Sequence, residues 1–296
     1  MTFRDELLAG RVLLDMGSDG IYGRSGAFED VVDGIAGIVH GMAVADGAPR
    51  VRFAPVEPRW VFDRTDYLNS FPDLTGAIMS FRGDDRDHAK LLAAAEAGED
   101  WTSMLTPAGA MLCPAVCHPL YPTLTGTLPE GGARYEVQGW CFRHEPSLDP
   151  GRMQAFRQHE VVYVGEPDGA RKHRDLWIER GVDVFTQLGL DVDAVVANDP
   201  FFGRVGRMLA ANQRDEELKI EVVAEIASAE NLTAIMSSNC HEDHFGAPFG
   251  ITTASGDVAH SACVGFGLDR VTLALFRKHG LDLGEWPSNV RERLFG

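Results

Sequence analysis

The chain has 296 residues, enough to bury a large core in one or two domains. Hydrophobic residues make up 45% of it and charged residues 24%, which are ordinary values for an ordered globular protein and exclude a disordered chain. The formal net charge of −17 disfavours a nucleic-acid-binding surface, because affinity for polyanions comes largely from Lys and Arg that neutralise phosphates.

The sequence has neither a membrane span nor a secretion signal. No stretch reaches the ~18 apolar residues of a membrane span, and the charged start Met-Thr-Phe-Arg-Asp-Glu-Leu does not fit a signal peptide. We therefore expect a cytoplasmic protein with no membrane partner. Five cysteines without a short-spaced framework argue for reduced thiols and leave metal ligation open.

Hydrophobic periodicity predicts a single α+β domain over 1–296, with an antiparallel sheet flanked by helices. From Phe28 to Met42, apolar residues recur at the spacing of an amphipathic helix, which ends near Asp46-Gly47. Residues 50–54 then alternate as an edge strand that stops before Pro55. The further predicted elements are a helix over 84–99, a buried segment over 111–116, strands over 135–145 and 156–164 joined by a long loop, a helical stretch over about 168–215, strands over 218–226 and 232–239, and a helix closed by Gly280.

The two strands around the long loop place suitable chemistry on one surface. Arg143 and Glu145 are two residues apart and face the same side of the sheet, as do Phe156, Gln158 and Glu160 on the partner strand. A cation for phosphate, a ring for stacking a base and carboxylates for amino groups thus converge. The alternative is a surface ion pair between Arg143 and Glu145, with Phe156 in the core.

Two stretches of the sequence resemble a known family. Cys141-Phe-Arg-His-Glu145 resembles motif 2 of class II aminoacyl-tRNA synthetases. Residues 262–276, a glycine-punctuated strand that runs into a helix with Arg270 at its start, resemble motif 3. The helix and strand before Pro55 resemble motif 1, which builds the dimer interface in that family. The resemblance implies the class II catalytic-domain fold and a homodimer formed through the motif 1 helix.

The resemblance also implies how ATP and an amino acid are held. Arg143 would bridge the amino acid carboxylate and the α-phosphate, and Arg270 would bind the γ-phosphate, so these two are the predicted catalytic residues. Phe156 would stack on adenine. The remaining residues of the implied ATP site are Glu145, near the adenine amino group, and Arg152 and Met153, along the nucleotide.

Two later segments resemble the paired strands of seryl-type synthetases. Lys219-Ile-Glu221 would contribute a carboxylate, and Ser237-Ser-Asn239 an Asn near the substrate. Gln158 and Glu160 complete the predicted amino acid contacts. Seryl enzymes usually have a Glu where this chain has Thr233, so the ligands of the Mg²⁺ that accompanies ATP stay open, with Glu221 as the nearest substitute.

A zinc site is the next prediction. Zinc accepts thiolate, imidazole and carboxylate ligands, and a catalytic zinc keeps one position open. Cys117, Glu160 and Cys263 resemble the zinc set of methanogen-type seryl synthetases and of amino acid:[carrier protein] ligases, in which the substrate amine completes the tetrahedron. Cys113 competes with Cys117 for the first position. His241-Glu-Asp-His244 is the rival metal location, and buried small hydrophobes are the alternative for the cysteines.

The chain resembles the amino acid:[carrier protein] ligases over about 25–285. Only about 27 residues precede the motif 1 helix and 26 follow Arg270, so we expect no tRNA-binding domain and no tRNA partner. The resemblance implies ATP-dependent activation of a small amino acid, glycine or alanine foremost, and its transfer to the phosphopantetheine thiol of a carrier protein. A compact seryl-tRNA synthetase and a silent paralogue acting as a regulatory subunit are the alternatives.

The predicted docking element for the carrier is the helical stretch over about 168–215. Five basic residues there would meet the acidic recognition helix of a carrier protein, and a solvated helix face is the alternative. They are Arg171, Lys172, Arg174, Arg204 and Arg207. The sequence leaves open which small amino acid is preferred, which carrier is the partner and what becomes of the loaded carrier.

Overall fold

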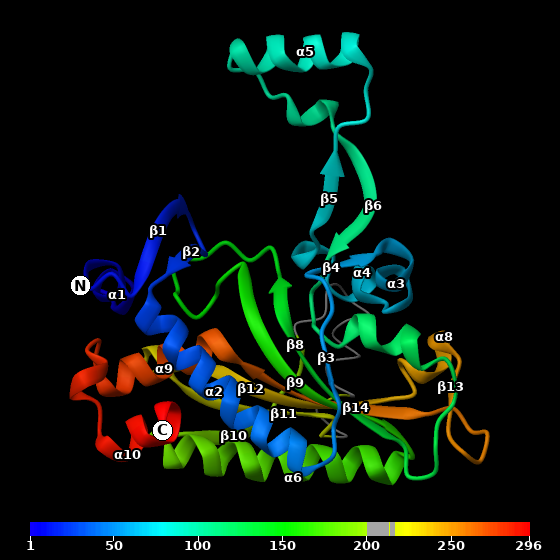
Figure 1. Ribbon diagram of the computed structural model, residues 1–296, viewed down its shortest axis with the longest axis vertical. Coiled ribbons are helices and arrows are strands. Elements are labelled where there is room, and N and C mark those ends of the chain that lie inside the picture. Colours follow the sequence, from blue (N-terminus) through cyan, green and yellow to red (C-terminus); the bar gives the residue numbers. More distant parts are fainter. Residues whose placement is uncertain (200–212, 214–216) are drawn as a thin grey trace.

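The computed structural model describes residues 1–199, 213 and 217–296. At the centre of these residues is a seven-stranded sheet of order β10-β11-β12-β14-β9-β8-β3 (Figure 1). Its strands are β3 (Arg50–Val51), β8 (Ala133–Phe142), β9 (Ala155–Gly165), β10 (Asp193–Val196), β11 (Lys219–Ser228), β12 (Asn231–Glu242) and β14 (His260–Gly267). Neighbouring strands are antiparallel, except that the edge strand β3 runs parallel to β8. The predicted antiparallel sheet is therefore confirmed.

The remaining described elements lie around this sheet or in an arm that stands away from it. The helices are α1 (Phe3–Ala9), α2 (Gly26–Ala45), α3 (Arg59–Arg64), α4 (Tyr67–Ser70), α5 (Asp85–Glu96), α6 (Pro167–Gln187), α8 (Gly246–Phe249), α9 (Leu268–His279) and α10 (Ser288–Phe295). The short strands are β1 (Leu13–Ser18), β2 (Ile21–Arg24), β4 (Val56–Pro58), β5 (Ala77–Ser80), β6 (Thr106–Leu112), β7 (Gly126–Thr127) and β13 (Ile251–Thr252). In the described part of the chain, no helix combines the length and the apolar character needed to cross a membrane.

Local signals account for the two helices that resemble motifs 1 and 3. The hydroxyl of Ser25 caps α2 by accepting a hydrogen bond from the backbone N–H of Phe28 at 3.2 Å. The second of these helices, α9, ends at Gly280, whose φ of 88° lies in the left-handed region that glycine adopts without strain. Both helix ends lie close to their predicted places.

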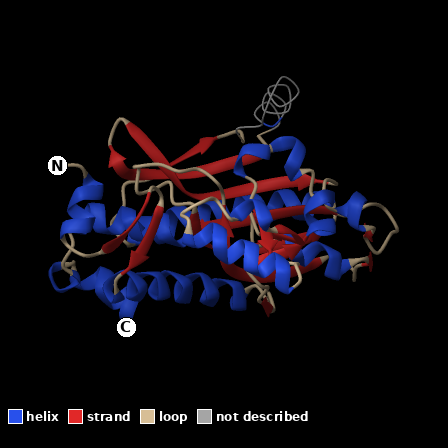
Figure 2. Cartoon of the chain, turned by 90° about the horizontal axis from the view of Figure 1, so that it is seen from above, coloured by secondary structure: helices blue, strands red, loops and turns tan. Residues whose placement is uncertain are grey.

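Helices α6 and α9 pack against the central strands of the sheet. In Figure 2 the helices are blue and the strands red. Trp177 and Phe185 of α6 pack edge-on against Phe266 of β14, with ring centroids 6.2 and 5.9 Å apart. Phe28 of α2 stacks on Phe276 of α9 at 6.2 Å. This core leaves the opposite face of the central strands for a site.

Two predictions on secondary structure are wrong in part. The stretch 168–215 is not helical throughout, because after α6 the residues Asp193–Val196 form the edge strand β10. This segment contains the β-branched residues Val195 and Val196, and it pairs antiparallel with β11. Arg204 and Arg207 lie outside the described residues. The predicted strand over 50–54 pairs only at Arg50–Val51, since Pro55 ends it.

An arm formed by β5, α5 and β6 stands away from the body (Figure 1). Strands β5 and β6 pair antiparallel and form its stalk, while α5 lies at its tip. The helix is confirmed within the predicted 84–99, and Asp84 caps its first turn by accepting from two backbone N–H groups. The sequence prediction missed the stalk, because β6 contains a proline and a glycine that weaken the strand pattern.

Candidate functional site

The register of four strands aligns polar residues on the face without helices. Glu160 of β9 lies opposite Gly265 of β14, which lies opposite Ser237 of β12, which lies opposite Glu221 of β11. Residues paired across an antiparallel sheet point to the same face. In the next row, Cys263 of β14 pairs with Asn239 of β12, so the predicted thiolate, carboxylates and amide share one surface.

Cys117, Glu160 and Cys263 form a buried cluster. One ligand atom from each lies within 4.8 Å of those from the other two, and among the described residues no further cluster of three metal-binding side chains occurs. Cys113 is not part of it, because its thiol donates to the carbonyl of Ala115 at 3.0 Å. The structure therefore brings the three predicted ligands together, and Cys113 lies outside their cluster.

The cluster suits a cation of zinc type. Oε2 of Glu160 is buried without a hydrogen-bond partner, and an unpaired buried oxygen is costly unless something completes it. Gly265 leaves room beside this carboxylate, since a Cβ built there would lie 3.5 Å from Oε1. Hydrogen bonding to Cys263 and burial raise the pKa of Cys117, and burial raises the pKa of Glu160. Metal binding requires the deprotonated thiol and carboxylate, so a bound cation would oppose these two shifts.

The rival metal location, His241-Glu-Asp-His244, is not a cluster. Nε2 of His244 donates to the carbonyl of Thr65 at 3.2 Å, away from the site. Nε2 of His241 instead lies 3.5 Å from the sulfur of Cys263. One residue of the rival motif therefore borders the predicted cage.

The two predicted catalytic arginines have no carboxylate within ion-pair distance among the described residues. Arg143 donates to the carbonyl of Pro114 at 3.1 Å and lies over the ring of Phe156 at 5.4 Å. Arg270 donates to the carbonyls of Gly151 and Ala234 at 2.7 and 3.0 Å. Burial and then repulsion from Arg143 lower the pKa of Arg270 to about 10. Two partly buried cations that repel one another create a site for an anion.

The other predicted ATP residues lie in two different places. Arg152 forms an ion pair with Glu145 across the loop between β8 and β9, at the exposed end of the site. Met153 instead lies in the helix-side core, only 5% exposed, with its sulfur accepting from Arg24 at 3.1 Å. The loop therefore presents Arg152 and Glu145 to the site and anchors itself through Met153.

The predicted substrate residues lie around the cluster. The amide nitrogen of Asn239 is 4.0 Å from the sulfur of Cys263, and the amide oxygen of Gln158 accepts from the thiol of Cys141 at 2.9 Å. Glu221 contacts Nζ of Lys219 at 2.9 Å, and that nitrogen also binds Asp199 at 2.5 Å. Burial disfavours the charge of Lys219, but both carboxylates outweigh it and raise its pKa. Sequence reasoning missed this lysine as a site residue, although it begins the quoted Lys219-Ile-Glu221 segment.

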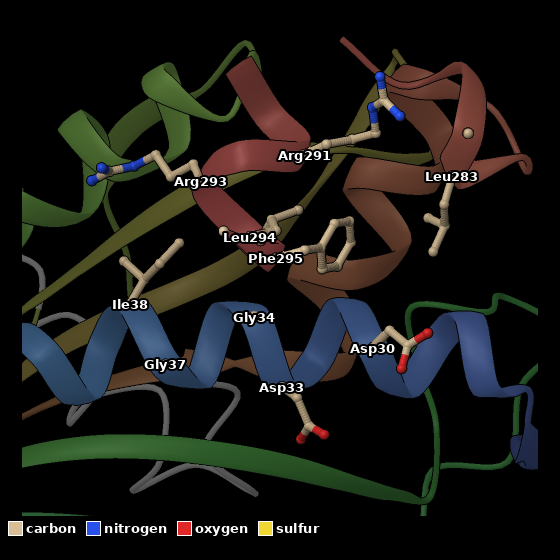
Figure 3. A pocket seen from close by; sticks show the side chains of 12 residues that line it. Asp30, Asp33, Gly34, Gly37, Ile38, Leu283, Arg291, Arg293, Leu294 and Phe295 are labelled. Carbon is tan, nitrogen blue, oxygen red and sulfur yellow. The ribbon is translucent and has the colours of Figure 1, made fainter. Parts of the chain in front are cut away.

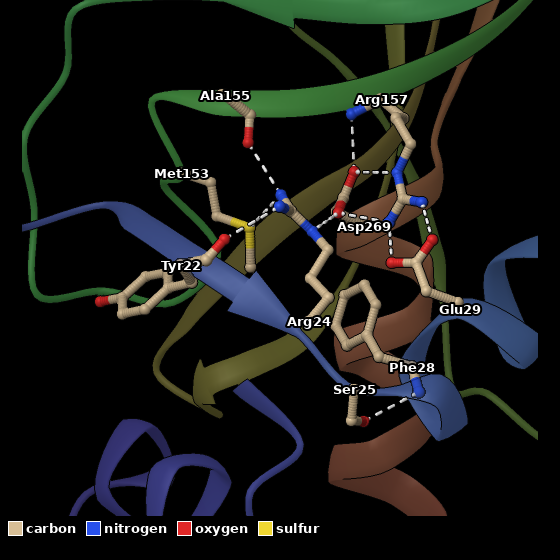
Figure 4. A network of polar contacts seen from close by, with 9 residues as sticks. All are labelled: Tyr22, Arg24, Ser25, Phe28, Glu29, Met153, Ala155, Arg157 and Asp269. Atoms are coloured by element: carbon tan, nitrogen blue, oxygen red, sulfur yellow. Dashed lines mark hydrogen bonds and ion pairs between the residues drawn. The ribbon is translucent and has the colours of Figure 1, made fainter. Parts of the chain in front are cut away.

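A buried ion network joins the three motifs (Figure 4). The carboxylate of Asp269, 1% exposed, binds Nε of Arg24 at 2.6 Å and the guanidinium of Arg157 at 3.0 Å. Arg157 also pairs with Glu29 of α2. Arg24 donates to the carbonyl of Ala155 at 2.8 Å, at the end of the long loop. The sequence signal for Asp269 is its place directly before Arg270, whereas Arg24 has no local signal.

A groove of about 830 Å³ lies between α2 and α10, on the flank of the motif 1 helix (Figure 3). Asp30, Asp33, Gly34, Gly37 and Ile38 of α2 line one wall, and residues of α10 line the other. A Cβ at Gly37 or Gly41 would meet no atom of the described residues within 4 Å. This side of α2 thus presents bare backbone to its surroundings.

The chain is similar in sequence to known proteins. Amino acid–[acyl-carrier-protein] ligase 1 of Bradyrhizobium diazoefficiens is 42% identical over 289 residues, 97% of this chain and 88% of that protein. A type-2 serine–tRNA ligase of Methanopyrus kandleri is 31% identical over 202 residues, 63% of this chain and 38% of that protein. No family model matches the chain.

Among solved structures, the complex of A. aeolicus tRNASec with M. kandleri SerRS is similar in fold. Its TM-score is 0.84 at 22% identity, over 99% of this chain and 60% of that chain. The predicted class II synthetase catalytic-domain fold is confirmed.

Proposed function

The chain belongs to the amino acid–[acyl-carrier-protein] ligase family, and from this premise we propose that it activates a small amino acid with ATP and transfers it to the phosphopantetheine thiol of an acyl carrier protein. One observation supports this above all. Arg143 and Arg270, without carboxylate partners among the described residues, border the same surface as the Cys117, Glu160 and Cys263 cluster. Such a surface suits an anion beside a metal-bound amine, which is what adenylate formation on an amino acid requires.

Zinc is the proposed resident metal. Cys117, Glu160 and Cys263 would hold it with two thiolates and one carboxylate, which leaves the fourth tetrahedral position for the substrate amine. When bound, zinc would act as a Lewis acid that fixes this amine in its uncharged form. Selection of glycine or alanine then needs only a pocket that excludes bulk, because recognition falls on the amino group.

In the first step, Arg143 would orient the amino acid carboxylate toward the α-phosphate of ATP. A carboxylate oxygen attacks the α-phosphorus, the bond to the bridging oxygen of pyrophosphate breaks, and pyrophosphate leaves with the electron pair. Arg270 would offset the charge of the departing phosphates, and the ring of Phe156 would stack on adenine. Arg152 and Glu145 would lie at the nucleotide's outer edge.

ATP enters such a site as its Mg²⁺ complex. Glu221 is the proposed protein ligand of that ion, since it lies in the same row as Glu160 and Thr233 offers only a hydroxyl. Lys219 holds one oxygen of Glu221 at 2.9 Å and so fixes the direction of the carboxylate.

In the second step, the phosphopantetheine thiol loses its proton to solvent and its sulfur attacks the carbonyl carbon of the adenylate. A carbon–sulfur bond forms, the carbon–oxygen bond to AMP breaks, and AMP leaves. Thiols are strong nucleophiles once ionised, so this step needs no general base from the protein.

The carrier is proposed to dock on α6. Arg171 and Lys172 are exposed near its N-terminal end, while Arg174 is held by Asp175 and by the carbonyl of Glu217. Charge reversal at Arg171 and Lys172 should raise the KM for the carrier and leave adenylate formation unchanged. Reversal of Lys90, on the distant α5, is the matched control and should change neither rate.

The experiment that tests the proposal is amino-acid-dependent pyrophosphate exchange with all twenty amino acids, with zinc measured on the same sample. We expect exchange with glycine or alanine and aminoacylation of a holo carrier. We also expect about one zinc per chain, because the chain contains one set of three proposed ligands. Absence of exchange would indicate a silent paralogue.

Binding of tRNA is the remaining alternative, and the similarity to a type-2 serine–tRNA ligase motivates its test. We propose that the chain does not use tRNA, because its net charge of −17 opposes a polyanion. Serine-specific charging of total tRNA would overturn the carrier-protein assignment.

A further inference from the structure

His241 approaches the metal cage from outside it. It lies near the end of β12 and its Nε2 is 3.5 Å from the sulfur of Cys263, which is hydrogen-bond distance for a sulfur acceptor. Its nitrogen atoms do not belong to the cluster formed by Cys117, Glu160 and Cys263. His241 is therefore placed to contact a ligand of the metal and not the metal itself.

The backbone around His241 is built to aim this ring. Cys240 pairs with Ala262 and Glu242 pairs with Ser261, so His241 is the extra residue of a β-bulge. Glu242 has a φ of 53°, a left-handed conformation that is costly for a residue with a side chain. Bulges of this kind redirect side chains beside functional sites. Phe245 packs edge-on against the ring at 4.9 Å and fixes its plane.

The second ring nitrogen determines what the first can do. Nδ1 of His241 lies 3.1 Å from the hydroxyl of Ser261, which is fully buried. A metal-bound Cys263 is a thiolate and can only accept a hydrogen bond. Nε2 must then hold the proton of the neutral ring, and Nδ1 must accept the proton of Ser261. In this chain of hydrogen bonds, Ser261 donates to His241 and His241 donates to Cys263, so every donor has an acceptor.

We propose that His241 is a positioning residue that donates a hydrogen bond to the Cys263 thiolate, with Ser261 fixing its tautomer. The inference rests on the metal site proposed above. A hydrogen bond to a coordinated thiolate withdraws electron density from the sulfur and makes the bound ion a stronger acceptor for the substrate amine. It also holds the sulfur in its ligating position. Partners of this kind typically contribute 10–100-fold to metal affinity.

The test uses His241→Phe, which keeps a planar ring and removes the N–H, and Ser261→Ala, which removes only the group that sets the tautomer. Metal affinity is measured by chelator competition, and the sulfur-to-metal charge-transfer band is recorded after Co²⁺ substitution. We expect His241→Phe to lose 10–100-fold in affinity and to move the band to lower energy. Ser261→Ala should also lower the metal affinity and move the band to lower energy, each by a smaller amount. His244→Phe is the control, because that ring contacts Thr65 and not the cage.

The outcomes separate the two proposals. If the unsubstituted protein binds no metal stoichiometrically, the zinc assignment fails. If it binds metal but His241→Phe and Ser261→Ala leave affinity and band unchanged, the zinc site stands and the role of His241 is overturned. A change in the Co²⁺ d–d bands of His241→Phe would make the imidazole a direct ligand, which also overturns the hydrogen-bond role.

Discussion

Asp269 is bound by Arg157 through both backbone and side chain. The backbone N–H of Arg157 donates to one carboxylate oxygen at 2.6 Å, and its guanidinium donates to the other at 3.0 Å. Asp269 directly precedes Arg270, so this contact fixes the start of the helix from which the proposed γ-phosphate ligand extends. Because Arg157 also pairs with Glu29 of α2, the three motif elements share one buried network.

Replacing Asp269 with Asn tests that network. Asp269→Asn leaves Arg24 and Arg157 facing a neutral amide, and breaking a buried ion pair typically costs about 3–5 kcal/mol. We expect this loss in the free energy of unfolding by urea titration, and a KM for ATP that rises more than kcat falls. The exposed pair between Arg59 and Asp63 is the control, since Arg59→Ala should cost under about 1 kcal/mol. Equal costs at both places would contradict a special role for Asp269.

The catalytic arginines are tested by charge-conserving replacements. Arg143→Lys and Arg270→Lys keep a cation but lose the planar fork that binds two oxygens. We expect pyrophosphate exchange to fall roughly 10²–10³-fold, the usual effect of removing one group that stabilises transition-state charge. Arg152→Lys, at an exposed ion pair with Glu145, should lose much less. An Arg270→Lys enzyme with full activity would show that the phosphates lie elsewhere.

Alternation along β9 predicts which of its side chains share one face of the sheet. Phe156, Gln158 and Glu160 follow a period of two, so their shared side could be predicted without any distant contact. The same is true of α2, where the apolar spacing matches the buried residues Val31, Val32 and Ile35. Local patterns of this kind depend on the backbone alone.

The convergence of distant residues could not be predicted in this way. Cys117 and Cys263 lie 146 residues apart (263 − 117), and only the family resemblance placed them together. Arg24 has no local signal, because its partner Asp269 is 245 residues away. Pairing of β10 with β11 is likewise a tertiary effect that overrides the helical spacing before it.

The metal cage is tested by comparing two cysteines. Cys263→Ala removes one thiolate, so we expect loss of both metal and amino acid activation. Cys113→Ala removes a buried thiol that donates to Ala115 outside the cage, so it should keep its metal. Plasma mass spectrometry measures the metal content of each variant. Pyrophosphate exchange on the same samples measures amino acid activation. Retained metal in Cys263→Ala, or lost metal in folded Cys113→Ala, would contradict a site formed by Cys117, Glu160 and Cys263.

His173 predicts a specific dependence of stability on pH. It is 4% exposed, donates from Nε2 to the carbonyl of Val161 at 2.9 Å, and burial lowers its pKa from 6.5 to about 4. Between pH 6.5 and 4 the unfolded chain therefore binds a proton that the folded chain does not, and stability falls as the pH falls through this window. The loss from this residue is roughly 3 kcal/mol.

His173→Gln isolates this contribution, because Gln can donate to the same carbonyl but does not titrate. Urea unfolding at several pH values should give a shallower slope between pH 4 and 6.5 for the variant than for the original protein. Other buried histidines contribute equally to the slopes of the two proteins, so their contributions cancel when the slopes are subtracted. Identical slopes would mean that His173 is charged or solvated in the folded state.

The homodimer that the family resemblance implies is proposed to form along the bare backbone of α2 at Gly37 and Gly41. A glycine inside a helix costs about 0.5–1 kcal/mol relative to alanine, and no atom of the described residues lies within 4 Å of a Cβ built at either position. Gly34 differs, since a Cβ there would meet the backbone oxygen of Leu294 at 2.6 Å. A second copy could approach the bare backbone at these two glycines closely, and Gly37 also lines the groove between α2 and α10.

Gly37→Arg separates assembly from folding. Arginine is a good helix former, so the isolated chain should gain up to about 1 kcal/mol of helix stability. A charged side chain between two closely packed helices should instead abolish the dimer. Sedimentation velocity at several concentrations measures the association, and thermal unfolding of the monomer measures the fold. A Gly37→Arg protein that stays dimeric would place the interface on another surface, because no dimer packed backbone to backbone along α2 can accept that side chain.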